Sequence, residues 1–290
     1  MHVLYLPSAH TSIVENMKLL HEEGIAIEEL PIRDARVDCE ALAKMLRKET
    51  VLVSMDAVCG ETGVIWNTRD VKQTMGADIF LHVDASQAPL TEKITRAHFG
   101  ADLLTLDGSK VGDVRGIGAL IARSTIPMSP LYRGGGQERG LRAGSESPEL
   151  AQKFAAMLSV TTQGRVAFRA RAGAMREKLT ADIAAMIPDV HVTESDAQAP
   201  HILNLSLPGR DTDYLVALLD EAGLAVSTRS ACETDSVAGS RAVLALTGDR
   251  ARALATLRIS WGPQTRAASL ARFVSALARS VAFVDKSNRR

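Results

Sequence analysis

The chain of 290 residues has little cysteine, few aromatic residues and no net charge. Cys39, Cys59 and Cys232 are odd in number and share no C-x-x-C spacing, which argues against a disulfide scaffold and against a zinc site. Basic and acidic residues both number 34, so no strong field attracts nucleic acid or an anionic membrane. We therefore expect a protein of the reducing cytoplasm, with neither nucleic acid nor a membrane as partner.

The sequence also has no long hydrophobic run. No apolar run approaches the ~20 residues that cross a bilayer. The start, MHVLYLPSAHTS, lacks the charged first part and the long apolar stretch of a signal peptide. Hydrophobic residues make up 46% and charged residues 23% of the chain, which excludes disordered and fibrous classes.

The first half of the chain alternates short apolar runs with amphipathic helical stretches. This rhythm predicts an α/β fold with a mainly parallel sheet covered by helices. The strand candidates are VLYLP, AIEELPI, VLVSMDAV, IFLHVDA, LLTLD and IGALIA. Open sheets of this kind bind ligands beyond the carboxyl ends of their strands.

From Pro148 onward the pattern changes to a long, alanine-rich stretch with a helical period. Short strands (ILNLSLP, LAVSTRS, LRISWG) then alternate with helices, which predicts a smaller α+β domain. We place the boundary near Arg165, with a large domain over 1–164 and a small domain over 165–290.

Polar side chains follow two neighbouring strand candidates. Asp84 and Gln87 come after LHV, and Lys110 comes after LLTLDGS. A lysine can act as an imine-forming nucleophile, and a carboxylate facing a pyridinium nitrogen keeps that ring an electron sink. Taken alone, Asp84 would rather cap a helix and Lys110 would be a solvated surface residue.

Longer motifs carry a family resemblance. HVDASQA, RGIGALIAR and RGGGQERGLRAGSESPELAQKFA are followed by ILNLSLPG, VSTRSACETDSVAGSRAVLAL and LRISWGPQT. In this order and spacing they resemble the cysteine desulfurases, class-V aminotransferase-like enzymes of the pyridoxal 5′-phosphate (PLP)-dependent transferase fold type I. The resemblance covers almost the whole chain.

The resemblance implies roles for the residues that match the family motifs. Lys110 would bind PLP covalently, Asp84 would pair with its ring nitrogen, and Gln87 would contact its phenolate oxygen. His10, in PSAHTSI, matches the histidine that stacks on the ring and helps to move protons.

Four further residues match positions with other tasks. Cys232 matches the mobile-loop cysteine that becomes a persulfide, and Arg258 matches the arginine that binds the substrate carboxylate in bidentate fashion. Ser109 would donate to the cofactor phosphate. Ser145 matches a hydroxyl that reaches the phosphate bound to the neighbouring subunit of a homodimer.

Three departures from the family pattern stand out. Asp107 replaces a serine that binds the phosphate, and Gly60 replaces an asparagine that contacts cofactor and substrate. The chain also begins just before the strand that leads to His10, so we expect an N-terminally shortened large domain without the family's glycine-rich phosphate turn.

Three functions follow from these observations. The first is a PLP-dependent cysteine desulfurase that converts L-cysteine to L-alanine and passes sulfur to an acceptor protein, for iron–sulfur cluster assembly or tRNA thiolation. The second is a non-catalytic or PLP-deficient homologue that acts as a subunit or binding protein. The third is a related lyase, such as a selenocysteine lyase.

Overall fold

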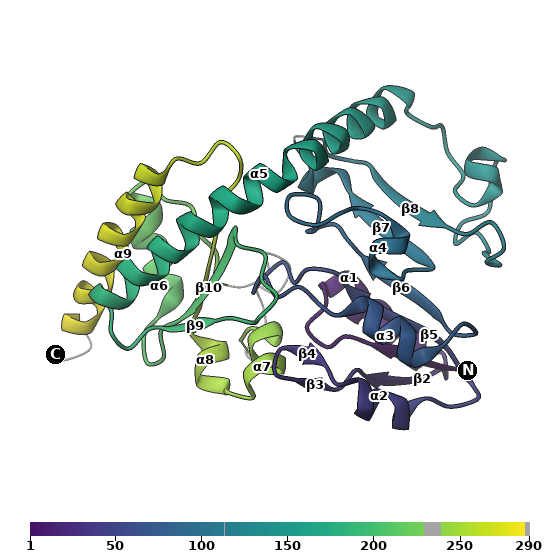
Figure 1. Cartoon of the computed structure of the whole chain (residues 1–290), viewed down its shortest axis with the longest axis horizontal. Coiled ribbons are helices and arrows are strands. Elements are labelled where there is room, and N and C mark those ends of the chain that lie inside the picture. Colours follow the sequence, from purple (N-terminus) through teal and green to yellow (C-terminus); the bar gives the residue numbers. More distant parts are fainter. Residues whose placement is uncertain (113, 229–238, 288–290) are drawn as a thin grey trace.

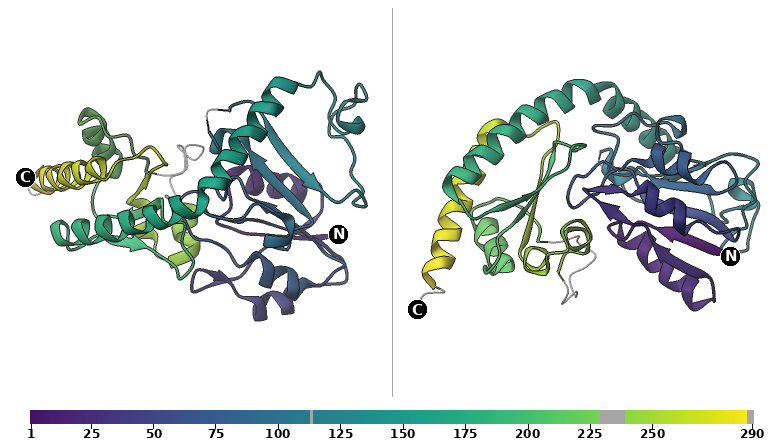
Figure 2. Two further views of the ribbon diagram at one scale, coloured as in Figure 1. Left: turned by 45° about the horizontal axis from the view of Figure 1, so that its top comes forward. Right: turned by 60° about the horizontal axis from the view of Figure 1, so that its bottom comes forward.

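The computed structural model describes residues 1–112, 114–228 and 239–287. Two lobes lie side by side, and one long helix, α5 (Pro148–Met186), runs across both of them (Figure 1). The two turned views show the same helix arching over the space between the lobes (Figure 2). The N-terminus and the C-terminal end lie at opposite ends of the molecule.

The larger lobe is built on a six-stranded sheet in the order β2-β1-β5-β6-β7-β8. Its strands are β1 (His2–Tyr5), β2 (Ala26–Glu29), β5 (Thr50–Asp56), β6 (Phe80–Asp84), β7 (Leu103–Asp107) and β8 (Gly118–Ala122). All neighbouring pairs are parallel except β7 and β8, which are antiparallel. The prediction of a mainly parallel sheet is confirmed.

Four helices accompany this sheet: α1 (Thr11–Glu22), α2 (Cys39–Met45), α3 (Thr68–Met75) and α4 (Arg96–Phe99). Local sequence sets where they begin. The Asp38 carboxylate accepts from the backbone N–H groups of Glu40 and Ala41 at the start of α2. The Thr95 hydroxyl accepts from the N–H of His98 at the start of α4. A short hairpin of β3 (Ile32–Arg33) and β4 (Arg36–Val37) precedes α2.

The alternation along β6 and β7 divides the sheet into two faces. Leu81, Val83, Leu104 and Leu106 are at most 2% exposed and belong to the apolar core of the large lobe. Their sequence neighbours point to the other face because side chains alternate along a strand. Toward the carboxyl ends of the strands, the residues on that face are polar: Ser54, His82, Asp84, Thr105 and Asp107. The sheet thus has one core face and one face available for chemistry.

A buried ionic cluster lies at the amino-terminal ends of β6 and β7. The Asp102 carboxylate, whose side chain is 3% exposed, accepts from Lys72 Nζ at 2.7 Å and from the backbone N–H of Leu81 at 2.9 Å. Arg123 lies 3.3 Å from the same carboxylate. Burial opposes ionisation of Asp102, but these partners outweigh it and hold its pKa below the usual range.

The smaller lobe contains the antiparallel sheet β11-β10-β9, formed by β9 (His191–Thr193), β10 (Ile202–Ser206) and β11 (Thr256–Ser260). Its helices are α6 (Thr212–Glu221), α7 (Arg241–Thr247), α8 (Arg250–Leu254) and α9 (Ala267–Ser287). A second core lies here, in which the C-terminal half of α5 packs with α6 and α9 over the inner strands. The expected α+β character is confirmed in these residues.

One expectation about this lobe needs correction. The run LAVSTRS does not form a strand over its described part; only Ser227 makes an isolated bridge, to Arg258. Helix α9 is long and apolar enough to cross a membrane by length and composition alone, although Arg272 and Arg279 interrupt its apolar run. Leu270, Phe273 and Leu277 of α9 are buried in the small-lobe core.

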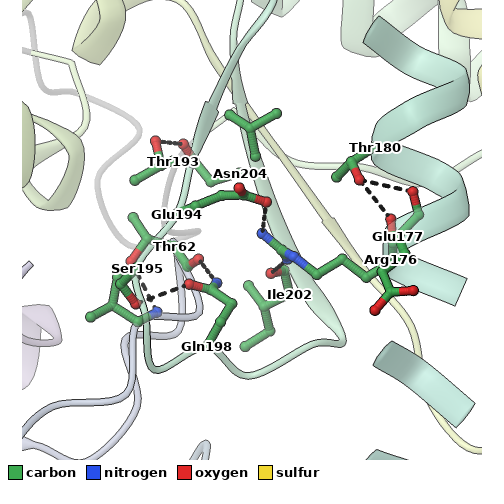
Figure 3. A network of polar contacts seen from close by, with 12 residues as sticks. Thr62, Arg176, Glu177, Thr180, Thr193, Glu194, Ser195, Gln198, Ile202 and Asn204 are labelled. Atoms are coloured by element: carbon green, nitrogen blue, oxygen red, sulfur yellow. Dashed lines mark hydrogen bonds and ion pairs between the residues drawn. The ribbon is translucent and has the colours of Figure 1, made fainter. Parts of the chain in front are cut away.

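Polar contacts tie the loop after β5 to the smaller lobe (Figure 3). Gln198 donates from its amide nitrogen to the Thr62 carbonyl at 2.7 Å, and the Ala199 N–H donates to the Gly63 carbonyl at 2.7 Å. Gly63 has a φ of +78°, and a Cβ there would lie 2.8 Å from the Ile202 carbonyl, so only glycine fits. The carbonyl of Ile202 in turn accepts from Arg176 Nη1 of α5 at 2.6 Å.

The domain boundary at Arg165 stays a prediction. Helix α5 continues through it, with Phe154 in the core of the large lobe and Phe168 in that of the small lobe.

Candidate active site

A cavity of about 320 Å³ opens where the carboxyl ends of β5, β6 and β7 meet the smaller lobe. Five of the predicted site residues line it: His10, Asp84, Gln87, Lys110 and Arg258. They come from segments up to 248 positions apart (258 − 10), and the fold brings them together as the family motifs predicted.

The floor of the cavity is a row of polar side chains on adjacent strands. Asp56 pairs in register with Asp84, and Asp84 pairs with Thr105. Below this row, His82 lies between two hydroxyls, with Nδ1 2.8 Å from Ser54 Oγ and Nε2 2.7 Å from Thr105 Oγ1. Burial lowers the pKa of His82, so a neutral ring, with one donor and one acceptor nitrogen, joins these hydroxyls.

Lys110 ends the short 3-10 helix η1 (Gly108–Lys110), which follows directly on β7. The close approach of the next segment explains the glycine here, because a Cβ on Gly108 would lie 2.7 Å from the Val114 carbonyl. Asp107 caps η1: its Oδ1 accepts from the Ser109 N–H at 2.9 Å, and its Oδ2 accepts from the Ser109 hydroxyl at 2.6 Å. The turn that presents Lys110 is therefore built around the Asp107 carboxylate.

His10 is the N-cap of α1. Its Nδ1 accepts from the backbone N–H of Ser12 at 3.2 Å and lies 2.8 Å from the Ser12 hydroxyl. Because Nδ1 accepts, the neutral ring carries its proton on Nε2. The helix start thus fixes both the position and the tautomer of His10 at the cavity wall.

Gly60 and Arg258 form the side of the cavity that belongs to both lobes. A Cβ at position 60 would lie 3.0 to 3.3 Å from the side chain of Gln87, so the Gln87 amide fills the space beside this glycine. Arg258 reaches across from β11 and donates from Nη1 to the Gly60 carbonyl at 3.2 Å. The guanidinium is therefore oriented before any ligand binds.

Burial keeps two acidic side chains of the cavity wall protonated. Burial, with the neighbouring Asp84 charge, raises the pKa of Asp56 to about 8. Burial, with a smaller effect of Asp56, raises the pKa of Cys59 to about 12. At neutral pH both groups are therefore mainly uncharged.

The remaining predicted residues lie elsewhere. Ser109 is exposed, and its hydroxyl is directed to Asp107. Ser145 is exposed in the segment before α5 and does not line this cavity. Cys232 lies outside the described residues.

The sequence analysis missed Asp56 and Arg241, which both line the cavity. Arg241 begins α7 and donates from Nη2 to the Ala9 carbonyl at 3.3 Å. A signal existed for Asp56: a carboxylate inside the apolar run VLVSMDAV is costly to bury and therefore marks a special position.

Comparisons with known proteins identify the family of the chain. The pattern of the aminotransferase class-V family matches residues 1–273. The chain belongs to the class-V aminotransferase family.

Curated relatives narrow the resemblance to cysteine desulfurases. The chain is 28% identical over 264 residues to cysteine desulfurase IscS 1 of Archaeoglobus fulgidus, which covers 90% of this chain and 69% of that protein. It is 29% identical over 254 residues to cysteine desulfurase NifS of Azotobacter vinelandii, which covers 87% of this chain and 63% of the relative. The chain thus spans about two thirds of the length of these relatives. The expected resemblance is confirmed.

A solved structure of a NifS-like protein confirms the fold. It superposes with a TM-score of 0.89 over 97% of this chain and 75% of its own, at 24% sequence identity. The expected PLP-dependent transferase fold type I is therefore present.

Class-V aminotransferases and cysteine desulfurases use PLP, and the two ends of the cavity differ in how they fit it. The ring end fits: Asp84 would hold the ring nitrogen, Gln87 the ring oxygen and Lys110 the aldehyde carbon. The buried Oδ1 of Asp56, which has no hydrogen-bond partner among the described residues, borders the same space. The phosphate end fits less well, because Asp107 places a carboxylate there and already binds the Ser109 hydroxyl.

The Cys59 thiol is expected to resist alkylation in the folded protein. With a pKa of about 12, roughly one thiol in ten thousand is ionised at pH 8, and the side chain is 1% exposed. Iodoacetamide labelling at pH 8 followed by peptide mapping should leave Cys59 unmodified and modify it fully in urea. Cys39, half-buried on α2, is the matched control and should react faster. Equal labelling of both cysteines would contradict the assignment.

Proposed function

We propose that this protein is a PLP-dependent cysteine desulfurase, which converts L-cysteine to L-alanine and leaves the sulfur as a persulfide on Cys232. The observation that carries the proposal is the meeting of His10, Asp84, Gln87, Lys110 and Arg258 around one cavity. The names of the curated relatives support the same substrate. From Cys232 the sulfur would pass to an acceptor protein for iron–sulfur cluster assembly or tRNA thiolation.

Each side chain has a task that its position permits. Bound PLP supplies an electron sink for charge that develops on the substrate carbon. Asp84 would hold the ring nitrogen, and the Lys110 amine, at the end of η1, would take or return a proton. Arg258, already oriented by the Gly60 carbonyl, would bind the carboxylate of the amino acid. His10 can donate from Nε2 at the cavity wall.

The sulfur step balances without an external oxidant. The Cys232 thiolate forms a bond to the substrate sulfur, and the carbon–sulfur bond of the substrate breaks. Its electron pair stays on carbon, which then takes up a proton, so that cysteine plus thiol gives alanine plus persulfide. Cys59 is unsuited to this step because burial keeps its thiol protonated.

We also propose that the protein acts as a homodimer in the cytoplasm. Exposed apolar side chains support a second copy of the chain as partner: Leu120 lies on β8, and Leu131 and Tyr132 lie in the loop that follows, 85% and 76% exposed. Ser145 lies in the next exposed segment, where it could reach a phosphate in the other subunit.

Product analysis with L-cysteine tests the function. The PLP-loaded protein is expected to form alanine and protein-bound persulfide in equal amounts during a first turnover without reductant. Cys232→Ser should carry no persulfide, whereas Cys39→Ser should behave as the unmodified protein does. Alanine without persulfide on Cys232, or no alanine at all, would contradict the proposal.

A further inference from the structure

The strand ends under the cavity carry two carboxylates where the proposed function needs one. Asp56 ends β5, Asp84 ends β6, and the two residues are register partners on adjacent parallel strands. Paired residues of neighbouring strands project to the same face about 5 Å apart. Both line the cavity, so both carboxylates face the same ligand space.

The surroundings of the two carboxylates are unequal. Asp84 accepts from the Ser86 N–H at 2.9 Å through Oδ1. Asp56 is 5% exposed, and its Oδ1 has no hydrogen-bond partner within the described part of the chain. A buried carboxylate oxygen without a donor strongly disfavours the ionised form. Of the two residues, Asp56 is therefore the one that carries a proton.

The other charged groups around Asp56 do not change which of the two carboxyl groups carries the proton. Arg241 of α7 favours the ionised form of Asp56, but it is outweighed by burial and by the Asp84 charge. The thiol of Cys59, three residues further along the chain, is itself protonated. His82, below Asp84 on the same face, is neutral. The remaining titratable groups on the cavity wall are His10, Glu61, Asp107, Lys110 and Arg258.

We propose that Asp56 and Asp84 share one proton and together form the receptor for a ligand cation, a protonated aromatic nitrogen. When such a cation binds at Asp84, its positive charge stabilises both carboxylates in their ionised form, and Asp56 releases its proton to solvent. The identity of the cation as the PLP ring nitrogen rests on the proposed function, whereas the shared proton does not.

The shared proton can be tested on the protein without cofactor, by denaturant unfolding between pH 4 and 9. Asp56 has a raised pKa in the folded state, so its favourable contribution to stability is present below about pH 4 and is lost as pH rises through about 8. Relative to Asp56→Asn, the folding equilibrium constant of the unmodified protein is expected to fall up to tenfold per pH unit in this window. Asp220→Asn, an exposed change on α6, should run parallel to the unmodified protein.

A constant difference between the unmodified protein and Asp56→Asn over this range would overturn the shared proton. Asp84→Asn is a second variant that decides the question if Asp56→Asn does not fold. It removes the neighbouring charge but leaves Asp56 buried, so unfolding over the same pH range isolates the effect of the Asp84 charge on Asp56.

Removing the Asp84 charge lowers the pKa of Asp56, because that charge is one of the causes that raise it. In Asp84→Asn the loss of stability should therefore end at a lower pH than in the unmodified protein. An unchanged end point would overturn the coupling between the two carboxylates.

The ligand part of the proposal is tested with pyridoxine 5′-phosphate, an alcohol analogue of the cofactor that cannot react with a lysine. Release of one proton on binding makes affinity rise up to tenfold per pH unit. The affinity ratio of the unmodified protein to Asp56→Asn is expected to increase in this way between pH 6 and 8. A ratio that does not change with pH overturns the receptor role and leaves the proposed function standing. No binding by either protein overturns the choice of PLP as ligand, and with it the proposed function.

Discussion

Lys110→Ala is expected to abolish cysteine turnover, with a loss of at least about 10⁴-fold, the scale seen when a covalent nucleophile is removed. Lys110 is the lysine that η1 presents to the cavity, on the floor that also carries Asp84. Its amine is expected both to bind the cofactor aldehyde and to move a proton on the substrate. The measurement is alanine formation from L-cysteine at saturating PLP.

Lys93→Ala is the matched control for Lys110→Ala, because Lys93 is a lysine of the same lobe that does not line the cavity. It should turn over as the unmodified protein does. Borohydride reduction of the PLP-loaded protein, followed by peptide mapping, should place the cofactor on Lys110. An adduct on another lysine, or full activity of Lys110→Ala, would exclude the assignment.

Asp107→Ser is expected to tighten PLP binding about 100- to 1,000-fold. The carboxylate of Asp107 would repel a bound phosphate, and it already accepts from the Ser109 hydroxyl. Serine at this position can still accept from the Ser109 N–H as a cap, so η1 should persist. One charge-assisted hydrogen bond gained is worth about 1.5–3 kcal/mol, and relief of the repulsion adds about 1–2 kcal/mol. Together these contributions amount to about 2.5–5 kcal/mol, and the middle of that range, about 3–4 kcal/mol, corresponds to two to three powers of ten.

Two companion variants separate the causes of this gain. Asp107→Asn removes the charge but keeps the acceptor, so it should recover the part due to repulsion. Asp220→Ser, an exposed change on α6, should leave affinity unchanged. Titration of PLP by absorbance measures all four proteins. Equally tight binding by the unmodified protein and by Asp107→Ser would show that the phosphate does not lie against position 107.

Sequence motifs predicted the sheet, the family and the five residues that meet in the cavity. They could do so because each motif places its side chain at a strand end or a helix start: His10 caps α1, Asp84 ends β6 and Lys110 follows β7. Local sequence determines such positions, and the parallel order of the strands brings them to one edge.

Contacts between distant segments could not be predicted in this way. Asp56 stands in an apolar run, and only the register of β5 against β6 shows that it faces Asp84. The fit of Gln87 beside Gly60 and the bond from Arg258 to the Gly60 carbonyl depend on how the lobes pack. The run LAVSTRS has the composition of a strand, but its described residues, 224–228, make one isolated bridge, because strand formation depends on pairing as well as on propensity.

Helix α5 links the two lobes in a way that bears on how the protein unfolds. Its 39 residues form one continuous helix, anchored by Phe154 in one core and by Phe168, Leu179 and Ile183 in the other. Fraying of the helix in either lobe removes backbone support from the other, because helical residues stabilise one another cooperatively. We therefore expect the two lobes to unfold in a single cooperative transition, and we expect a cut within α5 to leave each core without part of the helix that covers it.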